Sequence, residues 1–299
     1  FKSFILAIPI WIKEKLFQKK IILNELKLIF GKRFPSDKLL FSEHHLSHAA
    51  SAFYPSPFKT AAILTLDAVG EWSTSSLSVG EGNNIEVLKE INFPHSLGLL
   101  YSAFTYYLGF KVNSGEYKLM GLAPYGKPKY ADLIKEHLID IKEDGSFKLN
   151  MLYFDYCTGL KMINKRFEEL FGGKTRKPES DFNQRHMDIA ASIQEVTEEV
   201  VLKLAKSIKK ETNQKNLCLA GGVALNCVAN GALNKSKIFD NLWIQPASGD
   251  AGGSVGSALA IWHIMLNNKR DLSSIDKMSG SYLGPSYSND EIESSLKQM

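Results

Sequence analysis

The chain has 299 residues, of which 44% are hydrophobic and 23% are charged, a composition typical of a soluble globular protein with a substantial core. Its formal net charge is +4, but the charge is unevenly placed, because residues 1–36 hold eight basic and two acidic residues. The remaining residues hold 28 basic and 30 acidic groups, so a general nucleic-acid-binding surface is not indicated and we expect no nucleic-acid partner.

The first segment, residues 1–42, is basic and reads as amphipathic helices over residues 4–30. Its longest apolar run is nine residues, too short to span a bilayer, and it lacks the small-residue cleavage site of a signal peptide. We expect the helices to pack against the body of the protein, with a membrane-surface role as the alternative. The cysteines, Cys157, Cys218 and Cys227, form no CxxC pair, so reduced thiols in a cytoplasmic protein are the simplest interpretation.

A histidine-rich stretch follows at residues 43–54. Three of the seven histidines of the chain, His44, His45 and His48, fall within five positions. In a helix, His44 and His48 lie one turn apart on the same face and can bind one divalent metal ion. Two ligands need a third, so the spacing alone leaves open a helix whose histidines are only a polar surface.

Next, residues 61–66 form an apolar run that predicts a buried strand ending at Asp67. Gly70 and Glu71 lie in the turn that follows, and residues 85–91 predict a later strand of the same hairpin system. A turn with free amide N–H groups beside hydroxyl residues suits phosphate binding, although many ordinary hairpins share this pattern.

The middle of the chain contains an apolar helix over residues 96–110 and a long helix over residues 186–210. Between them, residues 113–126 show little periodicity, several glycines and an embedded Lys118, which predicts a functional loop. Residues 127–185 carry no pattern that indicates chemistry.

Two glycine-rich turns then follow short strands. The first strand, residues 216–220, leads through Gly221 and Gly222 into a helix that begins near Asn226. A strand, a glycine pair and a helix N-terminus together let backbone amides approach a nucleotide, and Asn226 can hydrogen-bond a ribose or phosphate oxygen.

The second turn follows a strand at residues 242–246 and opens another helix. It contains Asp250, Gly252 and Gly253. Asp250 lies where the chain leaves the strand, so it is a natural oxygen ligand to complete a metal site with the histidine pair.

Together these stretches resemble the NodU/CmcH-type O-carbamoyltransferases, whose core is similar to that of the tRNA threonylcarbamoyl transferases. The matching stretches, in the order of the family, are residues 43–54, 64–71, 115–126, 221–227 and 248–252. The resemblance implies an α/β protein of the actin/hexokinase-like (ASKHA) nucleotide-binding fold, incomplete at the N-terminus. It implies an ATP- and metal-binding core over residues 43–275. Residues 276–299 would begin a linker to a C-terminal domain.

The same resemblance implies roles for individual residues. A divalent metal, iron in close relatives with Mg, Mn or Zn as alternatives, would be held by His44, His48 and Asp250. The residues implied to line the ATP site are Gly70, Glu71, Gly221, Gly222, Asn226, Gly252 and Gly253. The catalytic groups at the phosphates would be Asp67 and, as a charge partner, Lys118.

Enzymes of this family form carbamoyl-adenylate from ATP and carbamoyl phosphate and pass the carbamoyl group to a hydroxyl of a sugar or natural product. The implied partners are therefore ATP, carbamoyl phosphate and a hydroxyl-bearing small-molecule acceptor, and a homodimer is compatible with them. The family's opening strands and its C-terminal domain, which handles carbamoyl phosphate, are not visible in the sequence. We therefore expect this chain to bind ATP and metal without forming carbamoyl-adenylate by itself.

Two alternatives remain. One is an enzyme like the tRNA threonylcarbamoyl transferases, against which the block at residues 116–126 and the near-neutral body argue. The other is a non-catalytic nucleotide-binding module, which the presence of every expected ligand in the visible blocks disfavours.

Overall fold

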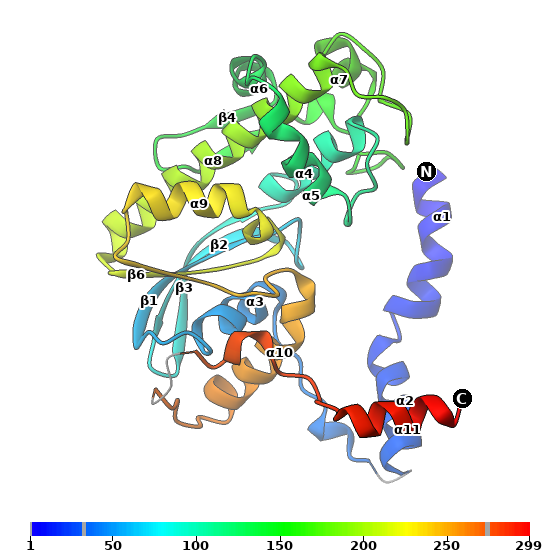
Figure 1. Cartoon of the computed structure of the whole chain (residues 1–299), viewed down its shortest axis with the longest axis vertical. Helices are drawn as coiled ribbons and strands as arrows, with labels where there is room; N and C mark the ends of the chain where they lie inside the picture. The colour runs from blue at the N-terminus through cyan, green and yellow to red at the C-terminus, as the bar shows by residue number, and fades with distance from the viewer. Residues whose placement is uncertain (1, 32–33, 273–275) are drawn as a thin grey trace.

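The structure is a computed structural model that describes residues 2–31, 34–272 and 276–299. It is a mixed α/β architecture built on a five-stranded sheet with the strand order β3-β2-β1-β6-β7 (Figure 1). The strands of this sheet are β1 (Thr60–Leu66), β2 (Ser73–Glu81), β3 (Asn84–Asn92), β6 (Asn216–Ala220) and β7 (Asn241–Ile244). The first three are antiparallel neighbours, whereas β6 and β7 run parallel to β1. A separate hairpin pairs β4 (Ile139–Ile141) with β5 (Phe147–Leu149).

Helices cover both faces of the sheet. The α-helices are α1 (Lys2–Ile10), α2 (Gln18–Phe30), α3 (His44–Phe53), α4 (Leu97–Tyr107), α5 (Glu116–Leu122), α6 (Ala131–His137), α7 (Lys165–Leu170), α8 (Gln184–Thr212), α9 (Cys227–Ser236), α10 (Asp250–Ala260) and α11 (Asn289–Lys297). One face packs against α3 and α10, and the other lies under α4, α8 and α9 (Figure 1). The predicted strands at residues 61–66, 85–91 and 216–220 and the predicted long helix are confirmed as β1, β3, β6 and α8.

The central strand β1 is buried on both faces. Leu64 and Leu66 belong to the hydrophobic cluster on the α8 side, whereas Ala61 and Ile63 belong to the cluster on the α3 side. A strand covered on both faces needs apolar residues at every position, which explains why this segment is a continuous apolar run rather than an alternating one.

The helices α3 and α10 cross in unusually close contact. A Cβ atom at Gly256 of α10 would lie 1.8 Å from the carbonyl oxygen of Ser47 on α3. Only a glycine permits this approach, because any side chain would overlap backbone atoms of the other helix. The contact brings the N-terminus of α10 to the first turn of α3.

The carboxyl ends of the parallel strands meet at one edge of the sheet. Asp67 follows β1, Gly221 follows β6, and the chain beyond β7 reaches Asp250 at the start of α10. Crevices at the carboxyl ends of parallel strands are the usual ligand sites of α/β sheets. The topology therefore gathers, at one place, three segments that are distant in the sequence.

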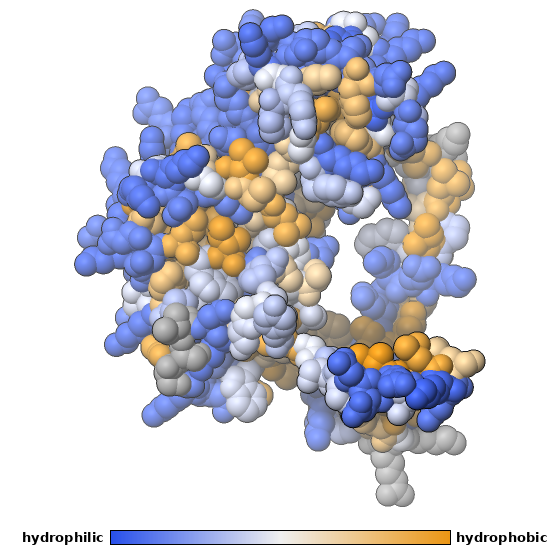
Figure 2. Space-filling view, viewed as in Figure 1, coloured by the Kyte–Doolittle hydropathy of each residue, from blue (hydrophilic) through white to orange (hydrophobic). Residues whose placement is uncertain are grey.

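The N-terminal segment corrects one expectation. Residues 3–31 contain no buried side chain, and large apolar residues such as Phe4, Trp11 and Leu28 are more than half exposed. Hydrophobic side chains accordingly show on the surface of this segment (Figure 2). The described side chains of this segment hydrogen-bond to the body at one point, where the Ser3 hydroxyl donates to the Thr158 carbonyl oxygen. The prediction that these helices pack against the body is wrong for the described residues, because none of their side chains is buried there.

A second correction concerns residues 113–126, which we predicted to form a loop. They contain the short helix α5 and a 3-10 turn at Ala123–Tyr125. The Glu116 carboxylate accepts hydrogen bonds from the N–H groups of Asn113 and Gly115, which closes the turn that begins α5.

The predicted domain boundary at residue 275 lies outside the described residues. Among the helices of the described residues, none combines the length and hydrophobicity needed to cross a membrane.

Candidate metal centre

Four side chains from three elements converge where α3, β1 and α10 meet. His44 and His48 lie on the first turns of α3, Asp67 follows β1, and Asp250 begins α10. One ligand atom from each residue lies within 4.8 Å of the other three. The structure thus brings together His44, His48 and Asp250, the three residues that we expect to bind a metal from the sequence. It adds Asp67 to the same cluster, whereas the sequence analysis places Asp67 at the phosphates.

The distances show a tight cluster. Nε2 of His44 lies 2.8 Å from Asp67 Oδ2 and 3.0 Å from Nε2 of His48. Both Nε2 atoms lie 3.6 Å from Asp250 Oδ1, and His48 Nε2 lies 3.4 Å from Asp67 Oδ2. Two imidazole nitrogens and two carboxylates form the mixed donor set that suits a divalent transition metal. The residues present therefore fit a metal ion.

The electrostatics of the cluster also favour a cation. The hydrogen bond to Asp67 raises the pKa of His44, against the opposing effect of burial. Burial alone would raise the pKa of Asp67, but hydrogen bonds from His44 and His48 hold it well below its usual range. Asp67 is thus an ionised carboxylate in a buried place, where it needs a positive partner. A proton on His44 or a metal ion can supply that charge.

Asp67 and Glu71 also have structural partners. The Gly222 N–H donates to Asp67 Oδ1 at 3.0 Å, which orients the carboxylate toward the histidines. Both carboxylate oxygens of Glu71 accept from the His44 backbone N–H, at 3.1 and 3.2 Å. Glu71 therefore places a negative charge at the N-terminus of α3, which stabilises the helix and holds His44.

The glycines predicted to line the ATP site differ in how much space surrounds them. Gly221 has φ +91°, and a Cβ there would lie 2.2 Å from the Leu66 carbonyl oxygen. At Gly70 a Cβ would lie 3.0 Å from His44 and His45, and at Gly252 it would lie 2.1 Å from the Ala247 carbonyl oxygen. Gly253 has open space beside it and lines the hollow at the cluster. Close approach to protein backbone, rather than to a ligand, is thus sufficient to require glycine at residues 221 and 252.

The two remaining predicted residues lie apart from the cluster. Asn226 is 9% exposed, and its Oδ1 caps α9 by accepting from the Ala229 N–H at 3.0 Å. Its Nδ2 donates to Gln194 Oε1 at 2.9 Å, so this amide is occupied within the protein. Lys118 is exposed on α5, and within the described residues it makes no hydrogen bond or ion pair with the cluster.

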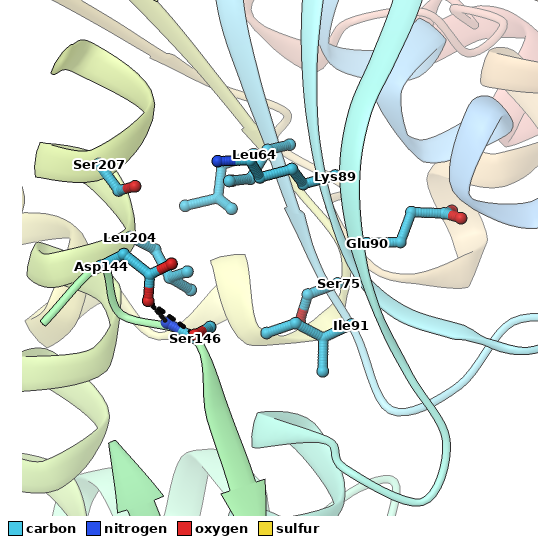
Figure 3. Close-up of a pocket in the computed structure, with 10 residues that line it drawn as sticks. Leu64, Ser75, Lys89, Glu90, Ile91, Asp144, Ser146, Leu204 and Ser207 are labelled. Carbon is cyan, nitrogen blue, oxygen red and sulfur yellow. Dashed lines mark hydrogen bonds between the residues drawn. The ribbon is translucent and has the colours of Figure 1, made fainter. Parts of the chain in front are cut away.

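Two cavities lie near the sheet. A hollow of about 310 Å³ opens at the cluster and is lined by Ser42, His44, Ser47, His48, Glu71, Asp250 and Gly253. A second, of about 230 Å³, lies on the opposite side of the sheet between β1–β3, α8 and the β4–β5 turn (Figure 3). Ser75 and Lys89 line the second cavity, whereas the carboxylate of Glu90 points away from it (Figure 3). None of the predicted site residues lines this second cavity, so the hollow at the cluster is the candidate site.

His45 behaves differently from its neighbours, a distinction that we did not draw from the sequence. Its Nδ1 lies 2.6 Å from Thr65 Oγ1, on the sheet side of α3, and burial lowers the pKa of its imidazole to about 4. The ring is therefore neutral at physiological pH. The helical rotation of 100° per residue could have separated His45 from the face shared by His44 and His48.

Comparisons with known proteins identify the family of the chain. Residues 1–259 match the family described as Carbamoyltransferase N-terminus. The protein sll1178 of Synechocystis sp. is 60% identical over 299 residues, which cover 99% of this chain and 48% of that protein. Nodulation protein NolNO of Sinorhizobium fredii is 36% identical over 263 residues, covering 87% of this chain and 36% of that protein.

A solved structure, T. kodakarensis HypF, aligns over 79% of this chain and 38% of that chain with 16% identity and a TM-score of 0.38, and we base no inference on it. The chain spans less than half the length of sll1178 and NolNO. Since the family match covers residues 1–259, the chain belongs to the carbamoyltransferase family, of which it contains the N-terminal region.

Proposed function

We propose that this chain is the ATP- and metal-binding part of an O-carbamoyltransferase. The whole enzyme would form carbamoyl-adenylate from ATP and carbamoyl phosphate and transfer the carbamoyl group to a hydroxyl of a sugar or natural product. The observation that carries the proposal is the cluster of two histidines and two aspartates beside the Gly221–Gly222 turn, in a chain of the carbamoyltransferase family. The sheet order β3-β2-β1-β6-β7 supports the actin/hexokinase-like fold type, in which an antiparallel meander is followed by parallel strands.

The proposed metal ligands are His44, His48, Asp67 and Asp250. A bound divalent cation would supply Lewis-acid stabilisation of phosphate oxygens. Asp67 and Asp250 would contribute negative charge from opposite sides of the cluster. The Asp250 side chain is 80% exposed, whereas that of Asp67 is 9% exposed, so the cluster is open toward solvent at α10. A substrate phosphate can approach from that side.

Backbone amides of this region support nucleotide binding. The helix α10 begins at Asp250, with Gly249 as its N-cap residue, and a helix N-terminus attracts anions. Among its first N–H groups, that of Gly252 already donates to the Gly249 carbonyl oxygen at 3.0 Å. Gly253 leaves the surface beside them free of side-chain atoms. Lys118 remains a predicted charge partner of the phosphates, and Asn226 would have to release Gln194 to contact the nucleotide.

The test of the reaction uses the full-length protein. ATP should be converted to AMP in a manner that depends on carbamoyl phosphate, and the adenylate should be detectable by mass spectrometry. Release of AMP from preformed threonylcarbamoyl-adenylate only when tRNA is present, without any need for carbamoyl phosphate, would instead favour an enzyme like the tRNA threonylcarbamoyl transferases. A protein that binds ATP without turnover under either condition would be the non-catalytic module.

The metal assignment has its own test. We expect His48→Ala to lose stoichiometric metal, because His48 supplies one of the two nitrogen ligands of the cluster, and a single imidazole with two carboxylates binds a transition metal more weakly. His137→Ala is the matched control, since His137 lies on α6 outside the cluster. Metal analysis after dialysis decides the question, and a full equivalent of metal in His48→Ala would refute the assignment.

A further inference from the structure

A chain of buried polar side chains runs from α3 across β1 to β2, on the sheet side of α3 and next to the metal cluster. His45 Nδ1 lies 2.6 Å from Thr65 Oγ1, and Thr65 Oγ1 lies 2.5 Å from Ser76 Oγ. The three residues are 6%, 0% and 1% exposed. Buried polar groups are costly unless they are paired, so these three side chains specify one relative position of the helix and the strands.

The chain of hydrogen bonds joins the elements that carry the proposed ligands. His45 lies between His44 and the next ligand along α3, and Thr65 is two residues before Asp67 on β1. The distance between the histidine and aspartate ligands therefore depends on how α3 sits on β1. The bond between His45 and Thr65 is a direct side-chain hydrogen bond between these two elements. The His45 ring centroid lies 5.7 Å from that of His44 and 6.1 Å from that of His48, two of the four proposed ligands.

The ring of His45 also supports the turn after β1. A Cβ added at Gly70 would lie 3.0 Å from Cδ2 of His45, so the Gly70 backbone already rests on the imidazole. The next residue, Glu71, accepts from the first N–H of α3. His45 thus contacts both β1, through Thr65, and the turn after β1, through Gly70. The same turn binds the first N–H group of α3 through Glu71.

We propose that His45 is a positioning residue that sets the geometry of the metal centre without binding the metal. This inference rests on the proposed metal centre. His45 contributes no ligand atom to the group of four whose atoms lie within 4.8 Å of one another. Metal–ligand distances in proteins vary by only about 0.2 Å, and loss of a group that hydrogen-bonds a ligand lowers metal affinity about 10–100-fold in known sites. The His45–Thr65 bond instead holds the two elements that carry the ligands, and we expect its loss to act within the same range.

Two substitutions remove the hydrogen bond and keep the volume. His45→Phe retains an aromatic ring under Gly70, and Thr65→Val retains the shape of Thr65, so neither leaves a large cavity. We expect each to weaken Co²⁺ binding about 10–100-fold in a chelator competition assay below the unfolding temperature. We expect the double variant to lose no more metal affinity than Thr65→Val alone, because both substitutions break the His45–Thr65 hydrogen bond and Thr65→Val also removes the one to Ser76. The visible absorption of bound Co²⁺ should change as well, since it reports ligand geometry.

Two further substitutions act as controls. Thr65→Ser keeps the hydroxyl and should bind Co²⁺ like the wild type. His45→Asn keeps a hydrogen-bonding group near the position of Nδ1 but loses the far side of the ring. It should lower the melting temperature through the lost contact with Gly70, while its metal affinity stays within a few-fold of wild type.

The outcomes separate the two proposals. If the wild type binds Co²⁺ and both His45→Phe and Thr65→Val bind it equally well with unchanged spectra, His45 is only a core residue and this inference fails. If His45→Phe does not fold, Thr65→Val alone decides the result in the same way. Absence of metal binding in the wild type would overturn the metal centre and this inference with it.

Discussion

The helix α3 and the segment α1–α2 show that burial does not follow hydropathy. In α3, eight of ten residues are buried, although the helix contains three histidines and two serines. In α1, a nine-residue helix rich in Phe, Ile and Leu, none of the described side chains is buried. A helix becomes part of the core when another surface matches it, not merely when its side chains are apolar.

The match around α3 has identifiable parts. Small residues let α10 approach, with Gly256 against the Ser47 carbonyl oxygen. Backbone carbonyl oxygens at the C-terminal end of α3 also have hydrogen-bond donors. The Gln245 amide donates to the Ser51 carbonyl oxygen, and Arg270 donates to the carbonyl oxygens of Tyr54 and Ser56 just beyond the helix. The segment α1–α2 has no such partners among the described residues beyond the contact of Ser3. Substitutions that remove these contacts of α3 should therefore lower the free energy of unfolding far more than equivalent changes in α1.

The largest effect is expected at the crossing of α3 and α10. Gly256→Ala should lower the free energy of unfolding by about 3 kcal/mol, because its Cβ overlaps the backbone of α3 and the helices must separate. Gly253→Ala, the same change on the same helix with open space around it, should be neutral or stabilising by about 0.5–1 kcal/mol. Urea unfolding of both variants tests this pair, and equal stabilities would contradict the close crossing.

A smaller effect is expected at Arg270. Its guanidinium donates to the carbonyl oxygens of Phe53, Tyr54, Ser56 and Phe58, at the C-terminal end of α3 and beyond it. Arg270→Met keeps an apolar stem but leaves these acceptors without their donor, which should cost about 2 kcal/mol. Lys269→Met, at the exposed neighbouring position, should change stability by less than about 0.5 kcal/mol. Similar midpoints for the two variants in a urea titration would show that the carbonyl oxygens find water instead.

The smallest effect is expected in the N-terminal segment. Trp11 and Phe17 are 58% and 54% exposed. Trp11→Ser and Phe17→Ser should therefore each change the free energy of unfolding of the five-stranded sheet and its covering helices by less than about 0.5 kcal/mol. Phe53→Ser, in the buried helix, should cost about 3 kcal/mol or more by the same urea assay. A loss above about 1 kcal/mol in the Trp11 variant would mean that this segment packs against another surface in solution.

Much of the fold could be predicted because the signals are local. The continuous apolar runs of β1 and β6 and the helical spacing along α8 are properties of neighbouring residues, and the structure confirms these elements. The pairing of His44 with His48 also follows from helical periodicity alone. The helix α5 was missed because its start depends on the side-chain bonds of Glu116, which leave no periodic trace.

The sequence by itself determined which residues could meet, since His44 and His48 share one face of a predicted helix, and Asp67 and Asp250 each follow a predicted strand. The tertiary structure decided how they meet, because the distance from Asp67 to the histidines depends on the packing of α3 against β1 and α10. It also decided that His45 faces Thr65, that the Asn226 amide binds Gln194 and that α1 stays exposed. Propensity and periodicity act over a few neighbouring residues, whereas these contacts join residues from 20 positions apart (His45 and Thr65) to 209 positions apart (Ser47 and Gly256), and only the packed chain sets their geometry.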